Sequence, residues 1–359
     1  MPSCARMRFF SLGSSMEKKA ALAAWVADYL PPGFALGQPV ELAAVTGDAG
    51  FRQYFRVNSH PTLIAVYAPP SHEDVPAFVA KDLAMKAAGV GVPEVYAVDY
   101  GQGFILQQDL GHQLLLPLLT ADSAPRLYRV AERELEKIQQ VAPDPAVFPP
   151  YDRATLNREM ALFPEWFVTR LLGVTLAAAD TALLARLFTL LEDAALAQPR
   201  VVVHRDYHSR NLLVGADGSL GVIDFQDALV GPFSYDLVSL LKDCYIRWPA
   251  ALVRERALAF LEQRARALGL HGLEGGELLR WFDLMGLQRH LKVLGIFARL
   301  WLRDGKPGYL SDLPLVLRYT LEVAQDYPEL EFFTHWFTER LHPCLPGQPW
   351  YRSWQSAGA

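Results

Sequence analysis

Hydrophobic and polar positions follow two different spacings along the chain, and the change between them divides it into two parts. Apolar residues recur at helical spacing after the capping pattern Ser14-x-x-Glu17, until Pro31-Pro32-Gly33 ends the segment. From about residue 40 to residue 110, short β-like runs interrupted by a single helix replace that spacing. The predicted strands are 40–45, 54–57, 62–67, 95–99 and 104–108, and the predicted helix is 75–88. This part therefore predicts a small sheet with one helix.

From about residue 121 onward the apolar spacing is mostly helical. The exception is 201–224, where an apolar strand at 201–203 leads into a polar loop, and 212–214 and 220–223 flank a turn as a β-hairpin. The predicted helices are 124–141, 155–171, 177–198, 234–246, 249–268, 276–303, 311–326 and 328–341. We expect an α+β fold of two lobes, a β-rich N-lobe and a larger α-helical C-lobe.

The boundary between the lobes is expected at Asp109-Leu110-Gly111, which places the N-lobe at 16–108 and the C-lobe at 109–359. Residues 1–15 are expected to form a flexible N-terminal extension, and Met16 is a second candidate for the natural start. A length of 359 residues agrees with two lobes, because it exceeds what one ordinary core organises.

Composition narrows the classes of protein that the chain can belong to. With 51% hydrophobic and 20% charged residues it has the balance of a globular protein, and its net charge of −5 lacks the basic excess of a nucleic-acid binder. Three widely separated cysteines indicate a reducing compartment without a disulfide framework. No run approaches the ~20 apolar residues that span a bilayer, and the N-terminus lacks the apolar core of a signal peptide. We therefore expect a cytoplasmic protein with no membrane partner.

The strongest chemical pattern is the polar loop after the strand at 201–203, which reads His204-Arg205-Asp206-Tyr207-His208-Ser209-Arg210-Asn211. The hairpin that follows ends in Asp224, so folding it should return this carboxylate beside Asn211. An amide oxygen and a carboxylate that converge in this way suit Mg²⁺. Asp206 is left to accept a proton from, and orient, an attacking hydroxyl. This division of roles is what phosphoryl transfer needs.

Each half of the pattern occurs by chance in unrelated proteins, but the order strand, loop, hairpin and Asp is specific. The segment 201–243 resembles the aminoglycoside phosphotransferase superfamily, relatives of the protein kinases that phosphorylate small molecules. The resemblance implies a bilobal kinase-like fold, ATP as phosphoryl donor, Asp206 as catalytic base, and Asn211 and Asp224 as magnesium ligands.

Further motifs between about residues 40 and 310 resemble one bacterial subgroup, anomeric sugar kinases that act on N-acetylmuramate and N-acetylglucosamine in cell-wall recycling. They are 46–57, 67–70 with Glu73 and Asp74, 108–111, Gly231-Pro232, 235–237 and 288–300. The resemblance implies a sugar 1-phosphate product and, as pathway partner, a sugar-1-phosphate uridylyltransferase.

The sequence departs from the kinase pattern at the strand 62–67, where a lysine is expected to hold the nucleotide phosphates. The run Leu63-Ile64-Ala65-Val66-Tyr67 has none. Backbone amides of the turn around Gly47, Ala49 and Gly50 are one substitute, and Arg52 or Arg56 is another. Either arginine could equally be solvated on a β-ribbon. By resemblance, the connector Gln107 to Asp109 meets the adenine.

Other polar residues have two interpretations each. Asp236 either braces the catalytic loop or stabilises a helix N-terminus, and His204 is expected to be a loop-bracing residue. His208 is either a substrate contact or polar filler. On the helix 276–303, cations at 289, 292, 299 and 303 share one face, which is either a solvated surface or a site for the lactyl carboxylate of N-acetylmuramate. The further candidates for sugar contacts are Asp227, Asp243, Gln288, Arg289, His290, Lys292 and Arg299.

An anomeric hydroxyl is a hemiacetal and more acidic than an ordinary alcohol, which makes phosphorylation at C1 chemically reasonable with Asp206 as base. Two alternatives stay open. The first is another small-molecule kinase of the superfamily, acting on an aminoglycoside, a choline-like alcohol or homoserine. The second is a catalytically dead nucleotide-binding scaffold, although such a protein often lacks one of the two aspartates.

Overall fold

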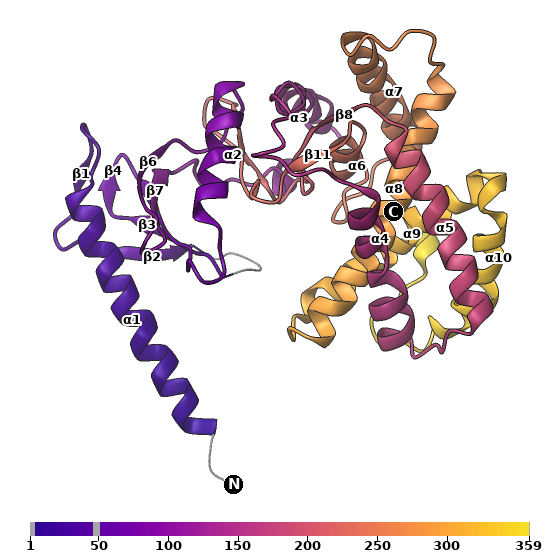
Figure 1. Cartoon of the computed structure of the whole chain (residues 1–359), viewed down its shortest axis with the longest axis horizontal. Helices are drawn as coiled ribbons and strands as arrows, with labels where there is room; N and C mark the ends of the chain where they lie inside the picture. The colour runs from indigo at the N-terminus through magenta and orange to yellow at the C-terminus, as the bar shows by residue number, and fades with distance from the viewer. Residues whose placement is uncertain (1–3, 46–50, 359) are drawn as a thin grey trace. The chain divides into compact units, whose positions relative to one another are not determined.

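The computed structural model describes residues 4–45 and 51–358, and the chain forms two compact units (Figure 1). The first unit consists of Met1–Gln113 and Leu213–Gln226, and the second of Leu114–Leu212 and Asp227–Ala359. The expected boundary at 109–111 thus lies close to the first crossing of the chain. The segment 213–226, which we placed in the C-lobe, packs instead in the first unit. The reason is a close contact, because Gly221 lies against Leu110 where a Cβ atom would be only 2.9 Å from Leu110 Cδ1.

A five-stranded antiparallel sheet forms the centre of the first unit. Its strand order is β2-β3-β5-β7-β6, with β2 Leu42–Val45, β3 Gln53–Val57, β5 Leu63–Tyr67, β6 Val95–Asp99 and β7 Phe104–Gln108. A separate pair joins β1 (Ala35–Leu36) to β4 (Ser59–His60). All five predicted strands are present, because their apolar runs have the length and alternation of strands.

Helix α1 (Cys4–Asp28) packs on one face of this sheet through Leu22, Trp25 and Val26, which share a core with Phe55 and Ala65. The helix begins at Cys4, so the expected start at Ser14 is wrong, and residues 4–15 belong to the helix. The reason is that a Ser-x-x-Glu pattern is also compatible with a helix interior when good helix formers precede it.

Helix α2 (Val75–Ala87) also belongs to the first unit and contacts the end of the returning segment 213–226. Asp74 caps it by accepting the N–H of Ala77 at 2.9 Å. Phe78 stacks on Phe225 with ring centroids 5.0 Å apart. The segment therefore closes against α2 just after the hairpin β9 (Leu212–Val214) and β10 (Leu220–Val222).

The second unit is mainly helical, and its longest helix, α8 (Gly275–Leu302), packs against helices α5, α6, α7 and α9 (Figure 1). The other helices are α3 Ala124–Ile138, α4 Arg153–Met160, α5 Ala178–Leu196, α6 Tyr235–Leu241, α7 Ala250–Ala267, α9 Leu313–Asp326 and α10 Glu331–Arg340. Short 3₁₀ turns are η1 Leu116–Leu118, η3 Pro307–Asp312, η4 Pro328–Leu330, η5 His342–Cys344 and η6 Trp354–Ser356. Among the helices that the structure describes, none has both the length and the apolar character needed to cross a bilayer.

Two predicted elements of the second unit differ from the structure. The helix expected at 155–171 is divided into α4 and a π-helix, η2 (Phe163–Leu171). Pro164 cannot donate a helical hydrogen bond, and a Cβ atom on Gly295 of α8 would lie 2.4 Å from the Leu162 backbone, so the two helices meet at this break. The strand at 201–203 is part of β8 (Arg200–Val203), which pairs with β11 (Leu229–Pro232) rather than with the hairpin.

Candidate active site

The catalytic loop of the second unit begins where β8 ends and is fixed by Asp236 in the first turn of α6. The backbone N–H groups of His204 and Arg205 donate to the two carboxylate oxygens of Asp236, at 2.6 and 2.9 Å. Asp236 is fully buried, so these bonds satisfy a carboxylate that solvent cannot reach. Asp236 thus braces the loop. Its place in the first turn of α6 is also compatible with the other interpretation, in which the carboxylate stabilises the helix N-terminus.

Arg205 holds the loop in an unusual backbone conformation. Its φ of 78° lies in the left-handed region, which costs a non-glycine residue about 1–2 kcal/mol. The N–H bond to Asp236 and an ion pair between the Arg205 guanidinium and Glu159 offset this cost. The turn places the next residue, Asp206, with 42% of its side chain exposed.

The carboxylate of Asp206 lies among cations. Partial burial alone would raise its pKa, but the charges of Lys292, Arg289 and Arg205 outweigh it and lower the pKa to about 2. The nearest of these is Arg289, whose Nη2 lies 4.0 Å from Asp206 Oδ1. Asp206 is therefore a carboxylate at any neutral pH, which a proton acceptor must be.

Arg289 and Lys292 are buried in the second unit, so the interpretation of their helix face as a solvated surface is wrong for these two residues. Arg289 is 3% exposed and Lys292 6% exposed. Arg289 Nε donates to Ser239 Oγ at 2.7 Å, and Lys292 Nζ donates to Glu159 Oε1 at 3.1 Å. Helical spacing places both on one face, but burial follows from partners that lie far away in the sequence.

Glu159, at the end of α4, is the central acceptor of this buried cluster and was not found from the sequence. It accepts from Arg205, from Lys292 and from the hydroxyl of Tyr151. Desolvation would raise the pKa of Glu159, and the cations Lys292 and Arg205 lower it below its usual value. A single glutamate in a helical run carries no sequence signal that distinguishes it from a surface residue.

Asn211 closes the catalytic loop, since its Nδ2 donates to the backbone carbonyl of Asp206 at 2.9 Å. The amide oxygen is then the end of Asn211 that suits a metal ion. Asp243 fixes the middle of the loop by accepting the N–H of Ser209 at 3.0 Å, and it also accepts the Ser209 hydroxyl. Asp243 is thus a bracing residue, since both its oxygens accept from the protein, and its contact with a sugar hydroxyl stays a prediction.

The two histidines of the loop differ in environment. His204 is fully buried, and its Nδ1 accepts the N–H of Asp206 at 3.3 Å, which agrees with a bracing position. His208 has a pKa lowered by burial, so its ring is neutral. Within 51–358 and 4–45, no partner reaches His208 Nδ1, which makes it a candidate for a substrate hydroxyl.

The remaining candidates for sugar contacts do not all approach Asp206. Gln288 is fully buried and donates to the Tyr151 hydroxyl at 3.2 Å, which joins it to the Glu159 cluster. Asp227 is exposed, and its backbone carbonyl accepts from Arg205 at 3.4 Å. Arg299 has Arg303, Asp304 and Glu165 among its charged neighbours, none of which belongs to the catalytic loop. The ring of His290 is neutral because burial lowers its pKa, and His290 Nε2 contacts the Lys242 carbonyl at 3.1 Å.

Asp224 belongs to the first unit, whereas Asp206 and Asn211 belong to the second. Its backbone is also left-handed, with φ of 67°, and its Oδ1 accepts from the side-chain amide of Gln226. The convergence of the three residues stays a prediction.

The available donor groups fit a magnesium ion better than a transition metal. Asp224 and Asn211 offer one carboxylate and one amide oxygen, which are hard ligands of the kind Mg²⁺ takes together with water and phosphate oxygens. In the described part of the chain, no three His, Cys, Asp or Glu side chains gather as a metal-binding group.

The predicted nucleotide-binding residues differ in what the structure shows of them. Gly47, Ala49 and Gly50 lie outside the described residues. Asp109 is held by Arg56, whose Nε and Nη2 reach its two oxygens at 2.6 and 3.1 Å, and by the N–H of Gly111 at 2.9 Å. The side chain of Asp109 therefore braces the connector. Gln107 lies on β7, buried, and its Oε1 has no partner among the residues described.

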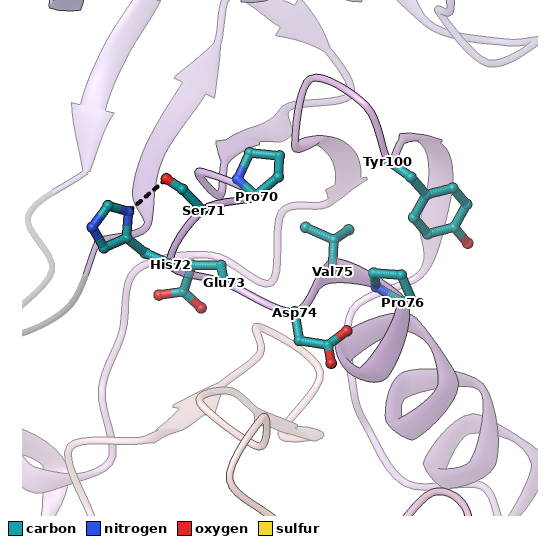
Figure 2. Close-up of a pocket in the computed structure, with 8 residues that line it drawn as sticks. All are labelled: Pro70, Ser71, His72, Glu73, Asp74, Val75, Pro76 and Tyr100. Carbon is teal, nitrogen blue, oxygen red and sulfur yellow. Dashed lines mark hydrogen bonds between the residues drawn. The ribbon is translucent and has the colours of Figure 1, made fainter.

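A pocket of about 370 Å³ lies in the first unit where the chain enters α2, and Figure 2 shows the residues that line it, among them Glu73, Asp74, Pro70 and Tyr100. Of its two carboxylates, Glu73 is paired with Arg52 at 2.9 Å, and Asp74 caps α2. None of the predicted site residues lines it.

Comparison with known proteins identifies the family to which the catalytic loop and its surroundings belong. Residues 41–272 match the family described as the phosphotransferase enzyme family. The chain belongs to this family. The match includes the first unit's sheet and the catalytic loop, and it ends before α8.

Curated relatives extend the similarity over most of the chain. The N-acetylmuramate/N-acetylglucosamine kinase of Pseudomonas putida is 46% identical over 80% of this chain and 85% of that protein. The protein of the same name from Neisseria meningitidis serogroup B is 38% identical over 88% of this chain and 93% of its own.

Solved structures share the fold at low sequence identity. Choline kinase from Cryptosporidium parvum matches with a TM-score of 0.58 and 12% identity, covering 89% of this chain and 99% of that one. Plasmodium vivax ethanolamine kinase matches with a TM-score of 0.57 and 11% identity, covering 87% and 96%. The expected bilobal kinase-like α+β fold is confirmed.

Proposed function

We propose that this phosphotransferase moves the γ-phosphoryl group of ATP to the anomeric hydroxyl of N-acetylmuramate and N-acetylglucosamine, giving the sugar 1-phosphates and ADP. The observation that carries the reaction type is Asp206, a carboxylate kept ionised by buried cations on a loop braced by Asp236. The names of the relatives at 46% and 38% identity support the choice of substrates.

In the proposed reaction Asp206 accepts the proton of the C1 hydroxyl as the new oxygen–phosphorus bond forms. The bond between the γ-phosphorus and the oxygen that bridges it to the β-phosphate breaks, and ADP leaves with that oxygen. Mg²⁺, which Asn211 and Asp224 would hold, neutralises phosphate charge when bound. His208, with its buried neutral ring, is a candidate to orient a sugar hydroxyl.

A carboxylate with a pKa of about 2 is a weak base, so it suits an acidic hydroxyl or one that loses its proton late in the reaction. The hemiacetal hydroxyl at C1 meets that requirement better than an ordinary alcohol. The cations Arg289 and Lys292 near Asp206 also disfavour a polycationic aminoglycoside or a choline-like acceptor. We keep those acceptors, and homoserine, as members of the test panel.

The proposal assigns the enzyme a place before an enzyme that consumes sugar 1-phosphates, such as a uridylyltransferase. Because its donor is ATP, we place the reaction in the cytoplasm, within cell-wall recycling.

The test uses the full chain with Mg-ATP and a panel of N-acetylmuramate, N-acetylglucosamine, glucose, choline, homoserine and kanamycin. ADP release identifies the acceptor, and ³¹P NMR should show coupling of the new phosphate to the anomeric proton. The methyl glycoside of N-acetylglucosamine, which has no free C1 hydroxyl, should not react. Phosphorylation of that glycoside would overturn the assignment to C1.

The variant Asp206→Asn separates a catalytic from a folding role. We expect it to fold with an unchanged Tm and to lower kcat by about 10²–10⁴. Full activity in this variant would exclude Asp206 as the base.

A further inference from the structure

The missing lysine leaves open which side chain holds the nucleotide phosphates, and the register of the sheet narrows the choice. On β5, Leu63 and Ala65 face the core with α1, so Ile64 and Val66 face the opposite side. Val66 pairs with Tyr54 on β3. Arg52 lies two residues before Tyr54, which places it on the same face as Val66.

The side chain of Arg52 is held rigidly inside the first unit. It is only 7% exposed, and its Nε forms an ion pair with Glu73 Oε2 at 2.9 Å. Its guanidinium carbon lies 4.6 Å from the centroid of the Phe78 ring. Arg52 is thus fixed by a charge on one side and an aromatic ring on the other.

Despite this burial, the guanidinium of Arg52 keeps a hydrogen-bond donor without a protein partner in the described part of the chain. Its Nε faces the Glu73 carboxylate, but its Nη1 is buried without a hydrogen-bond acceptor among residues 4–45 and 51–358. Buried donors are nearly always satisfied, so the unsatisfied Nη1 of a buried guanidinium points to an acceptor that the protein alone does not supply.

The neighbourhood of Arg52 includes the proposed metal ligand. Phe78, on which Arg52 packs, stacks on Phe225, the residue directly after Asp224. Tyr54 has a pKa raised mainly by burial, and both Arg52 and Asp224 act on that pKa by their charges. A cation and a metal-binding carboxylate therefore lie near the same tyrosine.

Arg56, the other candidate for binding the phosphates, already uses donors of its guanidinium within the protein. Its Nε and Nη2 bind the Asp109 carboxylate, and Nη2 also reaches the Gly111 carbonyl at 3.1 Å. Its role is to hold the connector.

We propose that Arg52, positioned by Glu73 and Phe78, binds the phosphates of the nucleotide donor in place of the missing lysine. The inference rests on the proposed kinase function. A planar guanidinium offers parallel N–H donors that match two phosphate oxygens, which a lysine on β5 could not do. Glu73 is then a positioning residue, since it contacts Arg52 and not the nucleotide.

The test measures binding of ADP and of adenosine to the full chain by calorimetry in the presence of Mg²⁺. In Arg52→Gln, which lacks the charge, we expect ADP to bind about 10- to 100-fold more weakly and adenosine to bind within about twofold of wild type. Arg52→Lys keeps the positive charge but lacks the planar guanidinium, so its affinity for ADP should lie between those of wild type and Arg52→Gln. Lys86→Gln, which removes an exposed cation of α2 paired with Glu94, is the charge-matched control and should leave both affinities unchanged.

Equal losses of ADP and adenosine affinity in Arg52→Gln would assign Arg52 a purely structural role and overturn the proposal, as would unchanged ADP binding. If Arg52→Gln does not fold, the ratio of ADP to adenosine affinity in Arg52→Lys decides, and an unchanged ratio refutes the proposal. Failure of the proposed function has a different signature, because wild type would then bind ADP but phosphorylate none of the sugars.

Discussion

At the scale of single residues, the unusual feature is that the proposed catalytic carboxylate, Asp206, lies near buried cations. Arg289 and Lys292 both lower the pKa of Asp206, although burial acts in the opposite direction. Each cation has its own anchor, Ser239 for Arg289 and Glu159 for Lys292. Asp206 is thereby kept ionised but made less basic, which in the proposed reaction favours an acidic hydroxyl as acceptor.

The double variant Arg289→Gln/Lys292→Met tests this balance. In wild type the pKa of Asp206 is about 2, so kcat/KM should show no acid limb from this group between pH 4 and 8. Without both cations only Arg205 still lowers the pKa against partial burial, so the pKa should rise to its usual value of about 3.9 or above, and an acid limb should enter the range of about pH 4 to 6. The measurement is kcat/KM against pH, with Tm as the check on folding.

Arg303→Gln provides the control for this experiment, because Arg303 follows α8 and is paired with the neighbouring Asp304. Its pH profile should match that of wild type. If the double variant also gives a flat profile at pH 4 to 6, the two cations do not set the charge state of Asp206.

At the scale of elements, α2 links the sheet to the end of the returning segment. Phe78 contacts Arg52 on one side and Phe225 on the other. One turn further along, Lys81 Nζ donates to the backbone carbonyl of Gln226 at 2.5 Å, and the Gln226 side chain donates to Asp224. The helix therefore fixes the position of the proposed metal ligand through two residues that follow it.

Replacing Lys81 with methionine keeps an apolar stem of similar length and removes this bond. Because the 224–226 segment then loses a buried charged donor, we expect the affinity for Mn²⁺ in the presence of ADP to fall about three- to tenfold. Electron paramagnetic resonance of free Mn²⁺ measures it directly. Lys86→Met, on the exposed side of the same helix, should bind Mn²⁺ like wild type, and equal affinities for both variants would show that α2 does not position Asp224.

Elements were predicted from the sequence more reliably than their environments. The helix expected at 276–303 occurs at 275–302, because its long apolar spacing is local information. Whether its cationic face meets water was not predictable, since burial of Lys292 depends on Glu159, 133 residues away. The same holds for Arg52, whose partner Glu73 and ring contact with Phe78 arise only when strand and helix pack.

At the scale of the whole molecule, the chain crosses between its two units three times, after Gln113, Leu212 and Gln226. The residues of the proposed reaction are divided accordingly, with Arg52 and Asp224 in the first unit and Asp206 and Asn211 in the second. The first unit depends on a segment that follows it by about a hundred residues in the chain. Its stability is therefore a property of the complete protein and has to be measured on the full chain.

Asp82, on α2, should make that stability depend on pH. It is 2% exposed, its Oδ1 has no hydrogen-bond partner within the described chain, and burial raises its pKa to about 7. Since the fold prefers the protonated form, the stabilisation is present below the unfolded pKa of about 4 and is lost as the pH rises from there to about 7. The loss amounts to at most about 4 kcal/mol.

The variant Asp82→Asn, which cannot ionise, tests this pH dependence. Its Tm, measured by calorimetry, should exceed that of wild type by more at pH 8 than at pH 5. Glu17→Gln, the same change of charge on the exposed surface of α1, should raise it at neither pH. An equal Tm change for Asp82→Asn at both pH values would mean that Asp82 keeps the same charge in the folded and unfolded protein.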